Sequence, residues 1–209
     1  MKKVVLSIFL VLITCSSTYA GLEEVGEATC KIKTPMGGGT GTVFKEDEDS
    51  LFILTAAHVV LDKLLEHESE VQLYFYNSGY KSDPIKGSIL WTAYSQEKVL
   101  DIAVIKVEKK SFNDYPTPEP IPIASEGYKI SKRDTVLSYG CPNGNWPSGW
   151  KGHISEVKPD RIMFVPMPLG GRSGSGVFDR KGERIIGIIV WKSGTAVHLN
   201  TIINTMKSH

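Results

Sequence analysis

The stretch Gly170-Gly171-Arg172-Ser173-Gly174-Ser175-Gly176 decides how this sequence is interpreted. Its glycines and serines make it a poor helix and a poor core strand. Glycine tolerates positive φ angles, so the chain can turn sharply here and bring backbone N–H groups close to a ligand. Taken alone, the stretch indicates only a Gly/Ser turn.

Two other motifs give this turn a chemical meaning. Thr55-Ala56-Ala57-His58-Val59-Val60 lies upstream, and Asp101-Ile102-Ala103-Val104 lies between the two. A serine hydroxyl is a weak nucleophile, and it needs a base such as a neutral imidazole to take its proton. A carboxylate behind the imidazole fixes its tautomer. We therefore predict His58, Asp101 and Ser173 as catalytic residues.

A tetrahedral intermediate also needs hydrogen-bond donors aimed at its oxyanion, and two backbone N–H groups of a tight turn suffice. The amides of Gly171 and Ser173 are the predicted oxyanion hole, because Gly171 can adopt a backbone geometry that most residues resist.

The first twenty residues have the pattern of a secretory signal peptide. Lys2 and Lys3 precede an apolar run over 4–13, and small residues precede a cleavage point after Ala20. The alternative is lipidation of Cys15, although Thr14 before it fits a lipoprotein signal poorly. We expect the mature protein, residues 21–209, to be secreted or periplasmic, with no stable membrane anchor after removal of the signal.

Composition excludes several classes of partner. The formal net charge is +1, and removal of Lys2 and Lys3 leaves 22 basic against 23 acidic side chains. A nearly neutral chain gives no reason to expect nucleic acid as a partner. Gly37-Gly38-Gly39 is not followed by the Gly-Lys-Ser/Thr of a nucleotide-binding loop, so no nucleotide is expected.

No metal site or other cofactor is predicted, since Cys30 and Cys141 do not form a C-x-x-C pair. Whether these two cysteines form a disulfide stays open.

Short apolar segments separated by turn residues predict a mostly β fold. The expected strands are 41–44, 51–55, 71–76, 88–91, 102–107, 136–139, 154–157, 161–165, 176–178 and 185–191. The segment 185–191 is nearly all apolar, which is typical of a strand buried on both faces. One or two helical turns are expected within 56–65, and a helix is expected from Leu199 through Met206.

A proline-rich connector divides the mature chain. Residues 111–123 contain Pro116, Pro118, Pro120 and Pro122, which disfavour both helix and strand pairing. We expect lobe one over about 30–110, with His58 and Asp101, and lobe two over about 124–209, with Ser173.

The motifs together resemble those of the trypsin-like (chymotrypsin-fold) serine proteases. Within that family the sequence looks closest to bacterial HtrA/DegP-type members, without the PDZ domain of that type, and to glutamyl-endopeptidase-like members. The resemblance is carried by Thr55-Ala56-Ala57-His58, Asp101-Ile102-Ala103-Val104-Ile105-Lys106-Val107, Gly171-Arg172-Ser173-Gly174-Ser175-Gly176, Gly39-Thr40-Gly41-Thr42-Val43-Phe44, Gly140-Cys141-Pro142 and Gly152-His153-Ile154-Ser155. The order His, Asp, Ser is that of this family.

The resemblance implies an all-β fold of two six-stranded antiparallel β-barrels, with the active site between them and a short C-terminal helix. It implies a serine endopeptidase acting on protein or peptide substrates. One departure stands out: Arg172 occupies the position where digestive members carry an aspartate that pairs with a freed N-terminus. Activation by insertion of a new N-terminus is therefore not expected.

The family pattern also suggests residues of the specificity pocket. Met167 stands where the pocket floor lies in relatives, so cleavage after Arg or Lys is disfavoured. Met167 and Val190 favour a small or apolar residue before the cut, whereas Lys192 and His198 favour an acidic one. The predicted substrate-binding residues are Met167, Val190, Trp191, Lys192, Ala196 and His198.

Two other functions fit the sequence less well. A non-catalytic protease-fold binding protein usually lacks one of the three catalytic residues, and this sequence keeps all three. A lipase or esterase of the α/β-hydrolase type needs G-x-S-x-G and the order Ser, Asp, His, neither of which is present.

Overall fold

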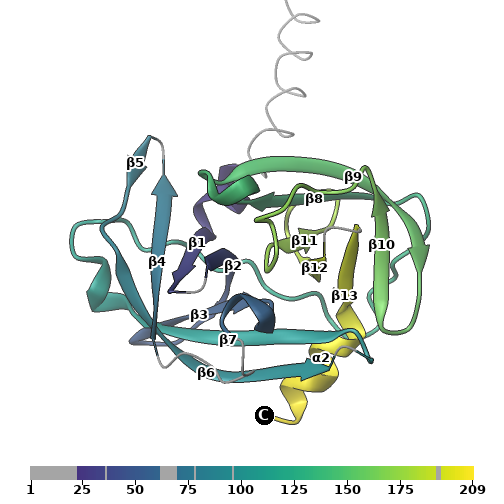
Figure 1. Cartoon of the computed structure of the whole chain (residues 1–209), viewed down its shortest axis with the longest axis horizontal. Coiled ribbons are helices and arrows are strands. Elements are labelled where there is room, and N and C mark those ends of the chain that lie inside the picture. The colour runs from purple at the N-terminus through teal and green to yellow at the C-terminus, as the bar shows by residue number, and fades with distance from the viewer. Residues whose placement is uncertain (1–22, 36, 62–69, 78, 96, 192–193) are drawn as a thin grey trace, which may run out of the picture.

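The structure is a computed structural model that describes residues 23–35, 37–61, 70–77, 79–95, 97–191 and 194–209. The predicted signal peptide, Lys192 and much of the loop after His58 lie outside these residues. Two β-barrels stand side by side, and the C-terminal helix packs beneath them (Figure 1). None of the described helices has the length and hydropathy that a membrane span requires.

The first barrel is built entirely from antiparallel pairs. Its strand order is β1-β2-β3-β7-β6-β4, and pairing of β1 with β4 closes it, while β5 extends the edge beside β4. The strands are β1 (Thr29–Thr34), β2 (Gly37–Glu46), β3 (Ser50–Thr55), β4 (Glu70–Asn77), β5 (Tyr80–Lys81), β6 (Ile85–Ser95) and β7 (Leu100–Glu108).

The second barrel is also closed, in the order β10-β13-β12-β11-β8-β9. Both six-stranded antiparallel barrels and the short C-terminal helix are thereby confirmed. The strands are β8 (Thr135–Gly140), β9 (Ser148–Val157), β10 (Arg161–Val165), β11 (Gly176–Phe178), β12 (Ile185–Trp191) and β13 (Thr195–His198), and α2 spans Leu199–Lys207.

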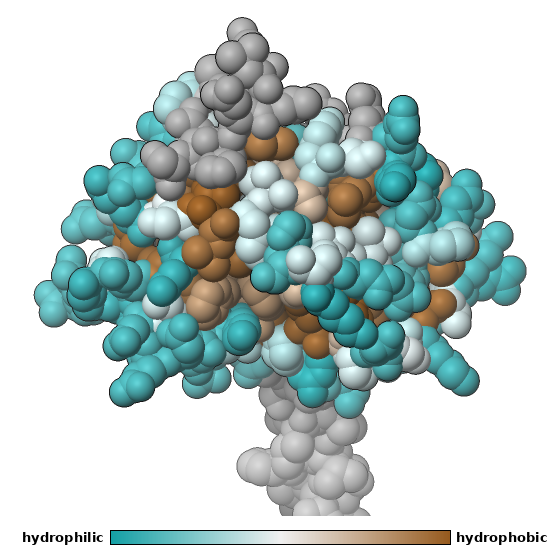
Figure 2. All heavy atoms as spheres, turned by 90° about the horizontal axis from the view of Figure 1, so that it is seen from below, coloured by the Kyte–Doolittle hydropathy of each residue, from teal (hydrophilic) through white to brown (hydrophobic). Residues whose placement is uncertain are grey.

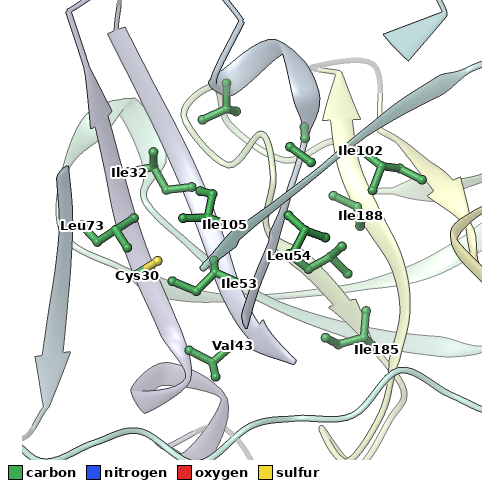
Figure 3. Close-up of a cluster of buried hydrophobic side chains, with 14 of the residues drawn as sticks. Cys30, Ile32, Val43, Ile53, Leu54, Leu73, Ile102, Ile105, Ile185 and Ile188 are labelled. Carbon is green, nitrogen blue, oxygen red and sulfur yellow. The ribbon is translucent and has the colours of Figure 1, made fainter. Parts of the chain in front are cut away.

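Hydrophobic alternation explains most of these strands. In β4, Val71, Leu73 and Phe75 are buried and point into the first barrel, whereas the residues between them face outward. In β12, both faces are buried as predicted. Ile185 and Ile188 pack with Ile53, Leu54 and Ile102 of the first barrel (Figure 3), and Ile186 and Ile189 belong to the core of the second. This strand therefore joins the two cores.

The structure adds three strands that periodicity did not predict. β1 carries two lysines and a cysteine, β5 is two residues long, and β13 is a short Thr-Ala-Val-His segment. β5 and β13 are too short to show a periodic pattern, and in β1 only Ile32 is strongly hydrophobic although buried and outward residues alternate. The expected helix within 56–65 is described only as a 3₁₀ turn, η1 (Ala57–Val59), and residues 23–27 are also helical.

The proline-rich segment connects the barrels along their sides. The Ile121 amide donates to the Val43 carbonyl of the first barrel, and the Ile185 amide of the second donates to the Pro122 carbonyl. Viewed from below β6 and β7, the surface is hydrophilic at its periphery, and hydrophobic groups gather toward its middle (Figure 2). The predicted site lies elsewhere, between the barrels.

Candidate active site

His58 and Asp101 are brought together by the pairing of β3 with β7. Thr55 at the end of β3 lies opposite Ala103, so Asp101 at the start of β7 is level with η1, which carries His58. The Asp101 carboxylate accepts hydrogen bonds from the His58 backbone amide at 2.9 Å and from the ring Nδ1 at 2.6 Å. These two bonds fix the ring relative to β7.

The two side chains differ in exposure. The Asp101 side chain is 3% exposed, whereas that of His58 is 35% exposed. A carboxylate only accepts hydrogen bonds, so Nδ1 carries the proton and the neutral ring keeps an acceptor lone pair on Nε2. The arrangement thus presents a basic nitrogen at the surface, held from behind by a buried acid.

Ser173 lies in a tight turn that enters β11. The Ser175 amide donates to the Arg172 carbonyl at 2.9 Å, and the Gly174 amide donates to the Ile189 carbonyl of β12 at 2.7 Å. Gly174 has φ +86°, and a Cβ there would lie 2.2 Å from Thr55 Oγ1 and 2.1 Å from the Thr40 carbonyl oxygen. The turn therefore requires glycine and sits against the strand end that leads to His58.

The first barrel also holds Ser173 through β2. The Thr40 amide donates to the Ser173 carbonyl at 2.8 Å. At Gly39 a Cβ would lie 2.6 Å from both the Ser173 carbonyl oxygen and a methyl of Val59, the residue after His58. The backbone at Ser173 therefore lies close to Val59, the residue after His58, where the two barrels touch.

Gly171 is fixed by the loop that precedes β9. Its φ is +89°, and a Cβ would lie 2.3 Å from the Cys141 carbonyl oxygen. The Asn143 amide donates to the Gly170 carbonyl at 2.6 Å. Because C=O and N–H point in opposite directions across a trans peptide, the Gly171 N–H points away from that loop. Neither this amide nor that of Ser173 donates to a described residue.

Thr40 is a site residue whose part the sequence did not reveal. Its hydroxyl donates to the Gly171 carbonyl at 3.1 Å and accepts from the Cys141 amide at 3.0 Å. One buried side chain of the first barrel thus ties two segments of the second. The only indication in the sequence was its place in the Gly39–Phe44 motif.

Arg172 is buried, with 4% of its surface exposed. Its guanidinium donates to the Ser148 carbonyl and hydroxyl and to the Gly149 carbonyl at the start of β9. Burial lowers the pKa of this guanidinium. No carboxylate of the described chain forms an ion pair with it. The resemblance places an aspartate at this position in digestive relatives. This protein instead has a cation there, hydrogen-bonded to uncharged oxygens.

The predicted pocket residues differ in their exposure to solvent. Met167 is 64% exposed, and it lies against Gly194 in the turn between β12 and β13. Val190 and Ala196 are buried in the two hydrophobic cores, so their side chains do not face solvent. The side chain of Trp191 and the whole of Lys192 lie outside the described residues.

His198 has a structural position that the sequence did not indicate. It is 7% exposed, and its Nδ1 accepts from the Asn200 amide at the start of α2. Burial lowers the pKa of its imidazole, against a smaller effect of Asp160 that raises it. The side chain is an N-cap. The structure therefore gives this buried side chain a capping role, which does not support its expected contact with a substrate.

The described residues offer neither a disulfide nor a metal-binding cluster at the site. Cys30 and Cys141 are both free and buried. Burial raises the pKa of both thiols, that of Cys141 to about 11. Among the described residues, no three His, Cys, Asp or Glu side chains gather as a metal site requires.

Comparison with known proteins defines the class. The sequence matches the family model of the trypsin-like peptidase domain over residues 39–188, a range that contains His58, Asp101 and Ser173. This chain belongs to that family, as its motifs predicted. None of the curated proteins compared with it matches.

Solved structures share its fold. Deg5 superimposes with a TM-score of 0.70 at 16% identity, covering 90% of this chain and 91% of that one. Rv3671c of M. tuberculosis H37Rv, solved as a serine-to-alanine mutant in an inactive form, superimposes with a TM-score of 0.65 at 17% identity. The match covers 91% of this chain and 89% of that one. The serine endoprotease of Yersinia pestis superimposes with a TM-score of 0.66 at 19% identity, covering 92% of this chain and 66% of that one. The protein thus has a trypsin-like serine protease fold.

Proposed function

We propose that this protein is a serine endopeptidase that hydrolyses peptide bonds through Ser173, His58 and Asp101. The observation that carries the proposal is the pair of hydrogen bonds from His58 to the buried Asp101, next to the turn that holds Ser173. His58 Nε2 takes the proton of the Ser173 hydroxyl as the oxygen attacks the carbonyl carbon. Asp101 stabilises the imidazolium that forms.

The reaction then passes through an acyl-enzyme. The tetrahedral oxyanion accepts hydrogen bonds from the Gly171 and Ser173 amides, whose freedom from other described acceptors supports this role. His58 returns the proton to the leaving amine, and the C–N bond breaks. Water, deprotonated by His58, attacks the ester carbonyl, and Ser173 leaves with its proton restored.

Labelling with a fluorophosphonate probe tests the proposal against a non-catalytic binding role. The probe should label the wild-type protein and not Ser173→Ala. Ser175→Ala is a matched control, because Ser175 is fully buried in the same turn and should leave labelling unchanged. Failure of the folded wild type to label would favour the binding protein.

Export is part of the proposal, on the evidence of the leader sequence alone. We propose cleavage after Ala20 and a secreted or periplasmic location. Intact-mass analysis of the exported form should give a chain that begins at Gly21. A lipid-modified Cys15 at the N-terminus would contradict the proposed cleavage.

A further inference from the structure

An exposed group of aromatic and lysine side chains lies where the first barrel meets the loop that precedes β9. Trp146 and Tyr76 are 40% and 36% exposed, and their rings stack with centroids 5.6 Å apart. Lys31 Nζ lies 5.7 Å from the centroid of the Trp146 ring, and Lys81 Nζ lies 5.3 Å from it. We call Lys31, Tyr76, Lys81 and Trp146 the aromatic–lysine patch.

Strand register assembles the patch from distant parts of the sequence. Lys31 of β1 lies opposite Tyr74 of β4, and Tyr76 of β4 lies opposite Lys81 of β5. These residues alternate with buried ones, so they share the outer face of the first barrel. Trp146 comes from the second barrel, in the loop before β9. Figure 1 shows β1 lying between β4 and the start of β9.

The patch is linked to the serine turn by direct contacts. Lys31 Nζ donates to the Gly144 carbonyl oxygen. A Cβ on Gly171 would lie 2.9 Å from the Gly144 amide nitrogen, so this loop contacts the residue whose amide, on its other side, is part of the proposed oxyanion hole. Lys31 also pairs with Thr40, whose amide holds the Ser173 carbonyl.

The position of the patch indicates which part of a substrate reaches it. Met167 follows β10 and Gly194 precedes β13, and Figure 1 shows these two strands on the opposite side of β11, the strand after Ser173, from β1 and β4. A peptide whose side chain enters the proposed specificity pocket at Met167 places its carbonyl at Ser173. Its continuation beyond the scissile bond then runs away from Met167, over β2 and β1, toward the patch.

The charge of the patch is not neutralised within the described chain. Lys86 and Lys109 pair with Glu70 and Glu46, whereas neither Lys31 nor Lys81 has a described carboxylate within ion-pair distance. Their ammonium groups lie over an aromatic face. A carboxylate that approaches the patch can accept a charge-assisted hydrogen bond from either ammonium group.

We propose that the aromatic–lysine patch binds an acidic side chain of the substrate on the leaving-group side of the scissile bond. The inference rests on the proposed peptidase function and adds a substrate class to it. Substrates with Asp or Glu after the cut are preferred to those with neutral or basic residues there.

Matched peptides test this selectivity. A fluorogenic series has the same acyl side and carries Glu, Gln or Lys at the second to fourth positions after the cut. One exposed ion pair contributes up to about 1 kcal/mol, so two lysines should raise kcat/KM for Glu over Gln by about fivefold to tenfold. Added salt should reduce this ratio. Equal kcat/KM for Glu, Gln and Lys peptides in wild type would overturn the proposal.

Variants separate recognition from a purely structural role. The double variant Lys31→Gln, Lys81→Gln should bring the Glu/Gln ratio of kcat/KM below about twofold, whatever its effect on turnover of the Gln peptide. Lys33→Gln is the control, because Lys33 is an exposed lysine on the same strand and should keep the ratio. If the double variant slows all peptides equally, the lysines only hold the loop and the proposal fails.

A binding assay distinguishes failure of this inference from failure of the proposed function. The full chain with Ser173→Ala is titrated with fluorescein-labelled leaving-group peptides containing Glu or Gln, and anisotropy is measured. Tighter binding of the Glu peptide supports the patch even if the wild type hydrolyses nothing, which would reject only the peptidase. If the wild type hydrolyses the Glu and Gln peptides with equal kcat/KM and the Ser173→Ala variant binds both peptides equally tightly, only the patch is rejected.

Discussion

The guanidinium of Arg172 donates from Nη1 to the Ser148 carbonyl oxygen and from Nη2 to the Ser148 hydroxyl, each at 2.9 Å. This pair joins the residue before Ser173 to the first residue of β9. Arginine presents several donors in one rigid plane, so a single side chain can bind both acceptors. The serine turn is therefore fixed by a contact within the second barrel, with no ion pair from a described terminus.

Replacing Arg172 with Lys should slow the reaction because one ammonium group cannot reproduce this planar arrangement. Removal of one oxyanion donor costs about 10²- to 10³-fold in other enzymes, so partial misplacement of Gly171 should lower kcat by about 10- to 100-fold. KM should change little. Steady-state kinetics with one peptide substrate, together with fluorophosphonate labelling rates, measure the effect.

The control for Arg172 is Arg161→Lys, which changes an arginine paired with Asp160 outside the site. Its kcat should equal that of the wild type. If Arg172→Lys melts at a lower temperature and yet keeps full kcat, Arg172 acts on stability alone and does not position the turn.

Asp101→Asn should lower kcat by about 10⁴-fold while leaving the fold intact. The asparagine amide can donate toward Nδ1, which shifts the ring proton to Nε2 and removes the base. Combining it with His58→Ala should add little, because the residues act as a unit. Additive losses in the double variant, measured as kcat at constant pH, would show that Asp101 and His58 contribute independently.

The predictable part of the fold is the part with local periodicity. β10, β11 and β12 have the predicted bounds, and β12 is buried on both faces because isoleucines occupy both of its sides. β13 has only four residues, too few for a periodic pattern. β1 does alternate, with Cys30 and Ile32 buried and Lys31 and Lys33 facing outward, but Ile32 is its only strongly hydrophobic residue, so the pattern is weak. Their pairing depends on partners far along the chain, which periodicity does not identify.

The site was only partly predictable for the same reason. His58 and Asp101 lie in motifs whose local sequence marks them. Arg172 and Thr40 act through Ser148 and Gly171, and the register that creates those contacts is a property of the folded barrels. The charge of His198 favours a pocket role, whereas its backbone position at the start of α2 makes it a cap, which charge does not indicate.

His198 should make stability depend on pH. Burial lowers the pKa of its imidazole in the folded state, so the unfolded chain binds this proton first as pH falls. Its contribution is complete above the ordinary value of about 6.5. It is lost progressively as pH falls below that value, when protonation also removes the Nδ1 acceptor for Asn200.

The measurement is the melting temperature of the wild type and of His198→Asn between pH 7.5 and 5. Asparagine caps a helix without titrating, so the variant should lose less stability over this range. His153→Asn, at an exposed site, is the control and should behave like the wild type. Parallel curves for His198→Asn and the wild type would show that His198 does not titrate differently on folding.

Residue 167 should set the preference for the side chain before the cut. Met167 is exposed against Gly194 and offers no charge to a cation, so cleavage after Leu, Phe or Met should exceed cleavage after Arg or Lys. A peptide library measures this profile. The alternative outcome is cleavage after Glu. In that case Lys192→Ala should weaken it, whereas His198, as a helix cap, should affect stability more than selectivity.

Met167→Asp gives the sharper test of the same prediction. A carboxylate at this position would pair with an entering Arg or Lys and offset the cost of desolvating that cation. The ratio of kcat/KM for Arg over Leu before the cut should rise by at least about tenfold. Leu169→Asp is the matched control. Leu169 is 60% exposed in the same loop, so an aspartate there adds the same charge at a position that is not the one against Gly194. A wild-type preference for Arg or Lys, or equal shifts in the two variants, would show that Met167 does not line the pocket.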